Sequence, residues 1–181
     1  MKTMKNLIKM TLAAATLCFV QLSNAQKLSL QSSNIKIEGT STLHDWTMTS
    51  TQATLSGNAS GNTINDVRFV MKTTSLKSKE SAMDKNAYKS LETSKYPDIT
   101  FTTASLPASG TATVSGNLTI TDVTKNIKFP VTVTKNGNSY IIKGSTKLKM
   151  SAFGIKPPSF MMGTIKTGDE ITININISAT N

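Results

Sequence analysis

The chain has 181 residues, 38% of them hydrophobic and 17% charged, with a formal net charge of +10 at pH 7. A single histidine and a single cysteine cannot supply the several nitrogen or sulfur ligands of a tight metal site, or a disulfide framework. The basic residues are dispersed lysines, with Arg68 as the only arginine, and this disfavours nucleic-acid binding.

The first 25 residues predict a cleaved signal peptide. Three lysines at positions 2, 5 and 9 precede an apolar run from Met10 to Leu22, and Ser23 and Ala25 are the small residues of a cleavage site after Ala25. The run is shorter than the about 20 apolar residues of a membrane span, although a retained anchor is the alternative. Cys18 leaves with this segment. We therefore expect a periplasmic or secreted protein of residues 26–181 with a net charge of +7.

Alternation of apolar and polar side chains through most of residues 26–181 predicts β-strands with one buried face. The expected strands are residues 27–38 (with a break at 32–34), 45–55, 67–72, 99–101, 112–120, 127–134, 140–148 and 171–178. Turns are expected at 57–58 and 61–62, and Asn136-Gly137 is a strong hairpin signal. Within strands, Gly116 predicts a bend or bulge, and Pro130 an outward, edge-like position or a bulge.

The most regular segment is Ile171 to Ser178, in which isoleucine alternates with small polar residues. Eight antiparallel strands with one apolar face predict an all-β barrel, whose interior is either filled by side chains or holds one small ligand. Alternation alone also allows a two-sheet sandwich. The residues expected to point inward are Val67, Phe69, Met71, Ile99, Phe101, Val114, Leu118, Ile120, Phe129, Val131, Val133, Ile142, Leu148, Ile171, Ile173, Ile175 and Ile177.

Residues 79–93 predict one short α-helix, because Met83, Ala87, Tyr88 and Leu91 recur at helical spacing. Ser78 or Ser81 is expected to cap its start, with Glu80 and Asp84 favourable near its N-terminus, and Pro97 follows its end. The helix is expected to lie across an opening of the barrel, either as a lid or as a plug that completes the core.

Residues 151–168 are a long connection that is unusually apolar for a surface loop. Its side chains Phe153, Phe160, Met161 and Met162 either line a ligand site, for which adaptable methionines are suited, or tuck into the barrel end as a satellite core. The pair Asp169-Glu170 that follows is interpreted as a solvated turn.

The sequence offers few side chains that could form a catalytic site. His44 is the only imidazole, its neighbour Asp45 would point to the opposite face of a strand, and no Gly-x-Ser-x-Gly motif occurs. We expect no catalytic residue, no metal and no cofactor. His44 is interpreted as a structural hydrogen-bonding residue or a contact to a ligand.

Four ordered blocks of the sequence resemble the YceI family. They are Gly39 to Trp46, Met83 to Leu91 followed by Lys95 to Phe101, Gly116 to Lys125 (with Asp122 in place of the usual glycine), and Phe153 to Ile155 with Gly168 to Ile173. The resemblance covers roughly residues 27–179 and implies an exported, eight-stranded, lipocalin-like barrel that binds a polyisoprenoid or an isoprenoid quinone, without established catalysis. Met83 stands where a basic residue is common in that family.

The leading hypothesis is therefore non-covalent binding of a long-chain amphiphile, for transport, storage or stress protection. Small inward residues (Ala112, Val114, Gly116, Val131, Val133 and Gly144) predict an unfilled tunnel, whose cavity cost an apolar chain would recover. The expected ligand-binding residues are Trp46, Met48, Phe69, Met71, Met83, Tyr88, Phe101, Phe129, Phe153, Phe160, Met161 and Met162. His44 and Asn86 are the candidates for contact with a head group.

Two other classes of function remain open. One is a non-catalytic structural or interaction β-domain of the cell envelope, and the other is an enzyme acting on a lipid through His44. The expected partner is a lipid or isoprenoid ligand, while peripheral contact with a membrane and a homodimer are both compatible with the sequence.

Overall fold

The computed structural model describes residues 25–181, so the predicted signal peptide, apart from Ala25, lies outside the described residues. The described strands are β1 (Gln26–Ser41), β2 (Trp46–Ser50), β3 (Ala53–Ser60), β4 (Thr63–Lys72), β5 (Asp98–Pro107), β6 (Gly110–Ile120), β7 (Val123–Asn136), β8 (Ser139–Lys149), β9 (Ser159–Phe160) and β10 (Ile165–Thr180). The helix α2 spans Ser81–Ser90, and short 3-10 helices span Thr73–Ser75 (η1), Met150–Phe153 (η2) and Met161–Gly163 (η3). Among these residues, no helix is long and apolar enough to cross a membrane.

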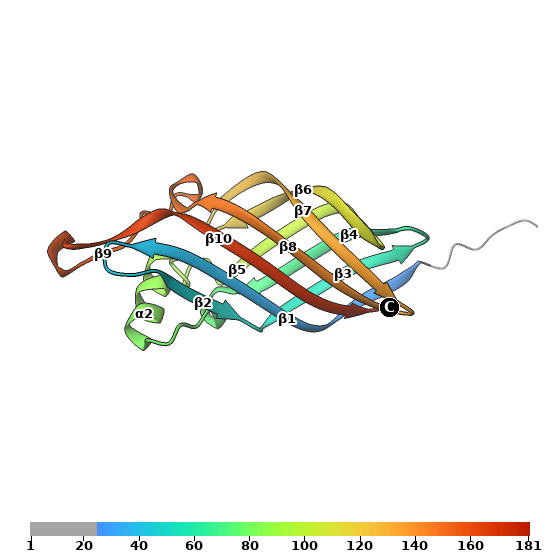
Figure 1. Ribbon diagram of the computed structural model, residues 1–181, viewed down its shortest axis with the longest axis horizontal. Coiled ribbons are helices and arrows are strands. Elements are labelled where there is room, and N and C mark those ends of the chain that lie inside the picture. The colour runs from blue at the N-terminus through green and yellow to red at the C-terminus, as the bar shows by residue number, and fades with distance from the viewer. Residues whose placement is uncertain (1–24) are drawn as a thin grey trace, which may run out of the picture.

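The strands close into a barrel with eight strand positions in its wall (Figure 1). Neighbours pair antiparallel from β3 to β8, then β8 pairs with β10, β10 with β1, and β1 with β3. β2 and β3 pair with successive parts of one edge of β1, at residues 35–39 and 26–29, and so share one position. The predicted all-β, eight-stranded antiparallel barrel is confirmed, and the β1–β10 pairing excludes an open sandwich.

The predicted inward face is also confirmed, since every residue expected to point inward is buried or partly buried. In β10, Ile173 and Ile175 pair with Ile37 and Ile35 of β1, so isoleucines meet across the closing seam. Register is enforced here because a one-residue slip would expose this whole row of isoleucines.

β1 is continuous, and the predicted break at 32–34 is wrong. A register shift against β10 falls between Leu30 and Ser32. This bulge explains why the inward apolar residues change parity, from Leu28 and Leu30 to Ile35 and Ile37. The irregularity in the sequence therefore marks a bulge in a strand.

The predicted turn at Gly57-Asn58 is likewise wrong, because both residues lie inside β3 at a register shift between Ser56 and Asn58. The turn is at 61–62, where Gly61 has a φ of +56°. A glycine in a strand is compatible with a bulge as well as with a turn, and only the pairing distinguishes the two.

Pro130 points outward, as predicted, and stands where the β7–β8 ladder ends at the Val131–Gly144 pair. Gly116 makes no bulge against β7, since the β6–β7 register is regular throughout β6. A Cβ on Gly116 would lie 2.3 Å from Cζ of Phe101, so the missing side chain makes room for that ring.

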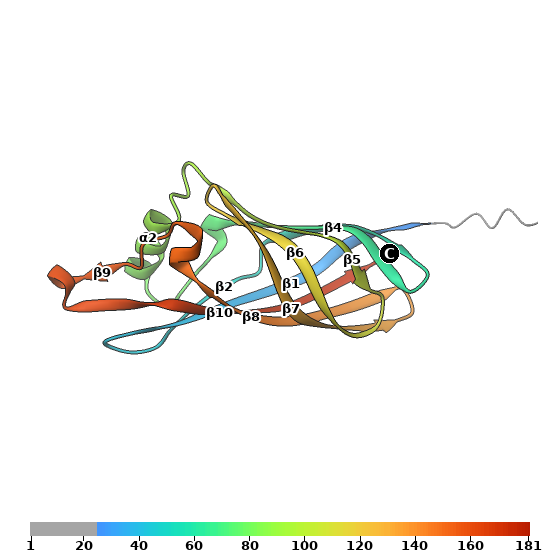
Figure 2. The ribbon, with the colours of Figure 1, turned by 90° about the horizontal axis from the view of Figure 1, so that it is seen from above.

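The two ends of the barrel differ (Figures 1 and 2). Near the C-terminus, the end is filled by Ile64, Tyr140 and Ala179, which are 0–1% exposed. At the opposite end, α2, β9 and the 3-10 helices gather around the ends of the strands. A cavity is therefore expected to open at the α2 end.

Candidate functional site

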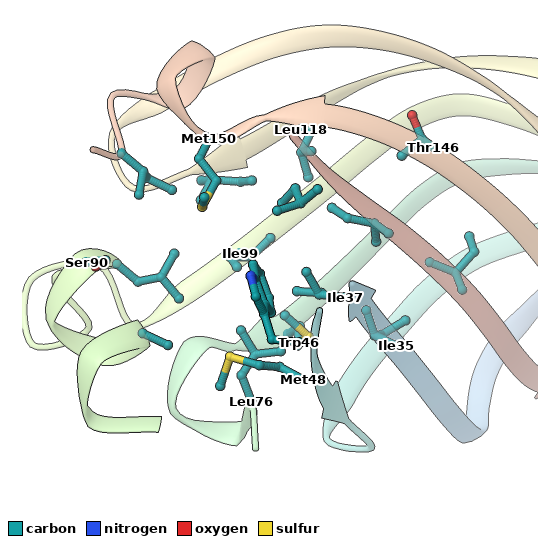
Figure 3. A pocket seen from close by; sticks show the side chains of 18 of the residues that line it. Ile35, Ile37, Trp46, Met48, Leu76, Ser90, Ile99, Leu118, Thr146 and Met150 are labelled. Carbon is teal, nitrogen blue, oxygen red and sulfur yellow. The ribbon is translucent and has the colours of Figure 1, made fainter. Parts of the chain in front are cut away.

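A cavity of about 480 Å³ occupies the barrel interior (Figure 3). It is within the range of small-molecule sites, about 300–1,000 Å³. Its deepest lining residues include Leu106, Val131 and Ile177. Beyond them, the closed end is solid core. At the other end, Leu43, His44, Glu80 and Ala82 line the cavity and are exposed, so the cavity opens to solvent there.

The cavity is long relative to its width. Its lining on β10 runs from Ile165 to Ile177, which is roughly 40 Å along a strand and roughly 30 Å along the barrel axis at the usual strand tilt. Ile171, Ile173, Ile175 and Ile177 all border the cavity, and the first and last of them are buried while the middle two are partly buried. The predicted tunnel therefore takes the form of a tube that is closed at one end.

The small inward residues were the wrong reason for expecting this tube. Of the six, only Val131 lines it. Gly144, like Gly116, lies against an aromatic ring, since a Cβ there would be 3.1 Å from the ring of Phe129. The wall of the tube is instead formed mainly by large apolar side chains, such as those of Leu55, Phe69 and Ile173.

Ten of the predicted site residues line the cavity. They are His44, Trp46, Met48, Phe69, Met71, Met83, Asn86, Phe101, Phe129 and Phe160. Phe101 and Phe129 form an edge-to-face pair, with ring centroids 5.6 Å apart, a favoured geometry. The structure thus brings together side chains from β2, β4, β5, β7, β9, α2 and the loop before β2.

Three predicted site residues do not line the cavity, and each has a physical reason. Phe153 is 2% exposed in a second core cluster with Leu118 and Ile120. Tyr88 is turned to the outer side of α2 by hydrogen bonding. Met162 is fully exposed, because its φ of 57° directs it away from the barrel. The side chain of Met161 is outside the part of the chain that the structure describes.

Several lining residues were missed, among them Leu55, Leu76, Leu106 and Met150. Leu106 lies on β5 beyond the end of the predicted strand, and its inward parity differs from that of Phe101. It pairs with Ile64, while Thr103 pairs with Val67. The alternation Ala53, Leu55, Gly57, Ala59 was the available signal for Leu55, but the supposed turn concealed it.

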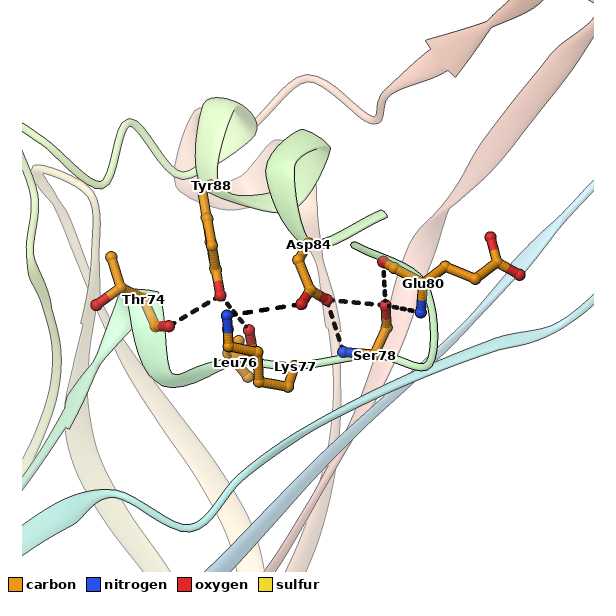
Figure 4. A network of polar contacts seen from close by, with 7 residues as sticks. All are labelled: Thr74, Leu76, Lys77, Ser78, Glu80, Asp84 and Tyr88. Carbon is orange, nitrogen blue, oxygen red and sulfur yellow. Dashed lines mark hydrogen bonds and ion pairs between the residues drawn. The ribbon is translucent and has the colours of Figure 1, made fainter. Parts of the chain in front are cut away.

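The helix α2 is fixed at its outer side by a polar network (Figure 4). The Tyr88 hydroxyl lies 2.8 Å from the carbonyl oxygen of Thr74 and 2.7 Å from that of Leu76, and donates to one of them. Asp84 accepts hydrogen bonds from the backbone N–H of Ser78 (2.7 Å) and its hydroxyl (2.8 Å). The helix therefore presents Met83, Asn86 and Ala87 to the cavity.

The predicted serine cap is wrong: the Ser78 hydroxyl accepts from the backbone N–H of Glu80 at 3.0 Å, before the first residue of the helix. No side chain caps the helix N-terminus at Glu80. Burial would raise the pKa of the Asp84 carboxyl, but the two hydrogen bonds from Ser78 and the Lys77 ammonium 3.7 Å away hold that pKa below its ordinary value. The ionised carboxylate thus ties α2 to the segment before it.

Asp169 anchors the other side of this end. The interpretation of Asp169-Glu170 as a solvated turn is wrong, because both lie in β10. Asp169 accepts hydrogen bonds from the hydroxyl and the backbone N–H of Ser151 in η2, and they lower its pKa. Glu170 pairs with Lys147 at 3.1 Å. η2 is thereby held over the gap where β7 and β8 no longer pair.

Polar side chains are confined mainly to the mouth. His44 sits in a turn in which its backbone N–H donates to the Ser41 hydroxyl at 3.1 Å. Its Nδ1 lies 2.7 Å from the Asp45 carbonyl oxygen, which can only accept, so Nδ1 donates in this contact. Within residues 25–181, no group of three or more His, Cys, Asp or Glu side chains is placed to hold a metal ion.

The match to a known protein family extends over the barrel. A model of the YceI-like domain matches residues 21–179. A UPF0312 protein of Pseudomonas putida is 33% identical over 105 residues, which are 52% of this chain and 55% of that protein. The chain thus matches about half the length of this curated relative.

Three solved structures share the fold. A polyisoprenoid binding domain from Saccharophagus degradans, implicated in plant cell wall breakdown, has a TM-score of 0.68 at 16% identity, covering 84% of this chain and 97% of that one. BcnA of Burkholderia cenocepacia has a TM-score of 0.66 at 19% identity, covering 82% and 96%. A mutant Campylobacter jejuni YceI protein has a TM-score of 0.58 at 17% identity, covering 91% and 90%. At such identities the likeness concerns the fold.

Proposed function

Because this chain belongs to the YceI-like domain family, we propose that its barrel binds a long-chain amphiphile non-covalently. The proposed ligand is a polyisoprenoid or an isoprenoid quinone. The observation that carries this proposal is the tube of about 480 Å³, apolar along its depth and open at one end. The similarity of the fold to a polyisoprenoid binding domain from Saccharophagus degradans supports the same ligand class.

The tube favours a chain over a compact ligand. Each buried methylene contributes about 0.8 kcal/mol, so a chain that extends from the mouth to Ile177 would bind tightly with few polar contacts. Branched isoprene units suit a wall of isoleucine, methionine and phenylalanine, which packs against irregular shapes. The apolar depth thus recognises the chain through its length and apolar character.

The mouth would hold the polar head. The second ring nitrogen of His44, Nε2, is a hydrogen-bonding group there, and the amide of Asn86 offers both a donor and an acceptor. A hydroxyl or quinone head at this depth would be hydrogen-bonded while its chain lies in the tube. We propose no catalytic step, because Asp45 contacts His44 through its backbone oxygen and supplies no carboxylate partner to the imidazole.

The protein is proposed to act outside the cytoplasm, as its predicted signal peptide indicates. A non-catalytic interaction domain of the envelope is the second candidate, and it requires no occupant of the tube. Measurement of bound lipid separates the two.

The test is mass spectrometry of an organic-solvent extract of the purified protein, followed by rebinding of a polyisoprenoid and a fatty acid to the delipidated barrel. Ile175→Trp should block the tube and lower ligand content severalfold, because Ile175 borders the cavity. Ile141→Trp is the matched control, since Ile141 is 43% exposed on the outside of β8. No ligand on the wild type in either assay, or equal content in Ile175→Trp, would favour the interaction domain.

A further inference from the structure

The mouth of the tube carries two fully or largely exposed apolar side chains. Leu43 is 65% exposed and Met162 is 107% exposed. Leu43 lies in the loop between β1 and β2, and Met162 in η3 at the start of β10. Burial of either side chain in an apolar phase would be favourable, and no intramolecular contact achieves it.

These two side chains belong to one edge of the molecule. The backbone N–H of Thr42 donates to the Lys166 carbonyl oxygen at 3.0 Å, and the Thr42 hydroxyl to that of Thr164 at 3.3 Å. Leu43 follows Thr42 directly, and Met162 precedes Thr164 by two residues. We call residues 42–44 and 159–166 the rim. In Figures 1 and 2, β9 and its neighbours form the extreme end of the molecule, beyond α2.

The rim is continuous with the cavity. Leu43, His44, Phe160 and Ile165 all line the tube, while Met162 extends from the same hairpin in which Phe160 pairs with Ile165. A surface that received the rim would therefore face the mouth directly.

The backbone conformation of Met162 is unfavourable for a methionine. Its φ of 57° is in the left-handed region, which costs a non-glycine residue energy and in hairpin turns is usually taken by Asn, Asp or Gly. A methionine here is both conformationally disfavoured and maximally exposed. Neither property helps the isolated fold, which points to a role in contact with something else.

The charge of the hairpin specifies what that contact is. Residues 154–168 contain Lys156 and Lys166 and no acidic residue, and both lysines are exposed. Exposed apolar side chains flanked by lysines match the interface of an anionic bilayer, which takes up the apolar groups and attracts the cations.

We propose that the rim docks on the surface of an anionic phospholipid membrane, with Leu43 and Met162 inserted and Lys156 and Lys166 at the headgroups. Docked in this way, the mouth opens onto the lipid phase, and an amphiphile passes between bilayer and tube without crossing water. This transfer step rests on the proposed function, whereas the docking itself does not.

The test is co-sedimentation with vesicles of phosphatidylcholine containing phosphatidylglycerol, compared with vesicles of phosphatidylcholine alone. Met162→Ser, at a residue that does not line the tube, should weaken binding roughly tenfold, the effect of one buried apolar side chain. Adding Leu43→Ser should weaken binding further. Lys156→Gln with Lys166→Gln should weaken it roughly tenfold or more, and added salt should weaken it further. Ile141→Ser removes an exposed apolar side chain far from the rim and should bind as the wild type does.

Melting temperature and ligand content, with the ligand supplied in detergent, are measured for each variant. Unchanged values in Met162→Ser and in the Lys156→Gln, Lys166→Gln variant, alongside weakened vesicle binding, support docking with an intact barrel, because none of these three residues lines the tube. No vesicle binding by the wild type, or an equal loss in Ile141→Ser, would overturn the proposal while leaving ligand binding testable. A dimer in solution that requires Leu43 and Met162, without vesicle binding, would assign the rim to a second copy of the chain instead.

Discussion

The substitution Gly39→Ala tests how the mouth of the tube is built. Gly39 pairs with Trp46 across β1 and β2, and the indole lies over the glycine. A Cβ on Gly39 would be 2.2 Å from Cζ2 and 2.5 Å from Cε2 of Trp46. Carbon atoms prefer separations of about 3.5–4.0 Å, so the ring must move by roughly 1 Å or more.

The cost has two parts. Overpacking of a fitted contact costs about 1–3 kcal/mol. Displacement of the ring also weakens the 3.0 Å hydrogen bond from Trp46 Nε1 to the Thr40 carbonyl oxygen, which is worth about 0.5–1.5 kcal/mol. Because Trp46 is only partly buried, the ring can yield, and we expect a total loss of about 1–2 kcal/mol. This corresponds to about 2–4 °C of melting temperature per kcal/mol for a domain of this size.

The assay is favourable because Trp46 is the only tryptophan in the chain, so its emission reports this site alone. Gly39→Ala should shift that emission, lower the melting temperature measured by circular dichroism, and reduce ligand retention. In a Trp46→Leu background the same substitution should cost less than about 0.5 kcal/mol, as a double-mutant cycle would show. An unchanged melting temperature and emission in Gly39→Ala, or an equal cost in both backgrounds, would refute the contact.

Two further predictions concern the same end of the barrel. Phe160→Ser should reduce ligand retention with little change in melting temperature, because Phe160 is partly exposed at the mouth. The control Phe153→Ser, at a residue that is 2% exposed, should lower the free energy of unfolding by about 3–5 kcal/mol. A large loss of stability with normal ligand content in Phe160→Ser would show that Phe160 is an ordinary core residue. Asp84→Asn should lower the melting temperature at neutral pH and flatten its fall in acid. The folded state depresses the pKa of Asp84, so its stabilisation is complete above the unfolded pKa and is lost as pH falls through the lower folded pKa. Parallel melting curves for the two proteins from pH 7 to about pH 2 would contradict this sign.

The sequence by itself determined the wall of the barrel. Period-2 alternation is a local property of an extended backbone, so the isoleucines of Ile171 to Ile177 show their shared face without any knowledge of their neighbours. The number of such segments then predicts closure. Trp46, Met48, Phe69, Phe101 and Phe129 could be assigned to the inside on the same ground.

Bulges were harder to recognise than strands. The sequence shows a change of parity in β1 and a glycine in β3, but a bulge and a turn share these signals, and only the pairing with β10 and β4 resolves them. Leu106 was missed because β5 continues beyond the predicted strand and because its inward parity differs from that of Phe101.

Only the tertiary structure decided which apolar residues border the tube and which are solid core. Helical spacing groups Tyr88 with Met83, yet the carbonyl oxygens of Thr74 and Leu76 hold the Tyr88 hydroxyl on the outer side. Phe153 enters the core where the β7–β8 ladder ends, and the left-handed backbone of Met162 turns it outward. Each outcome depends on partners distant in sequence or on one dihedral angle, and neither is encoded in the alternation of neighbouring residues.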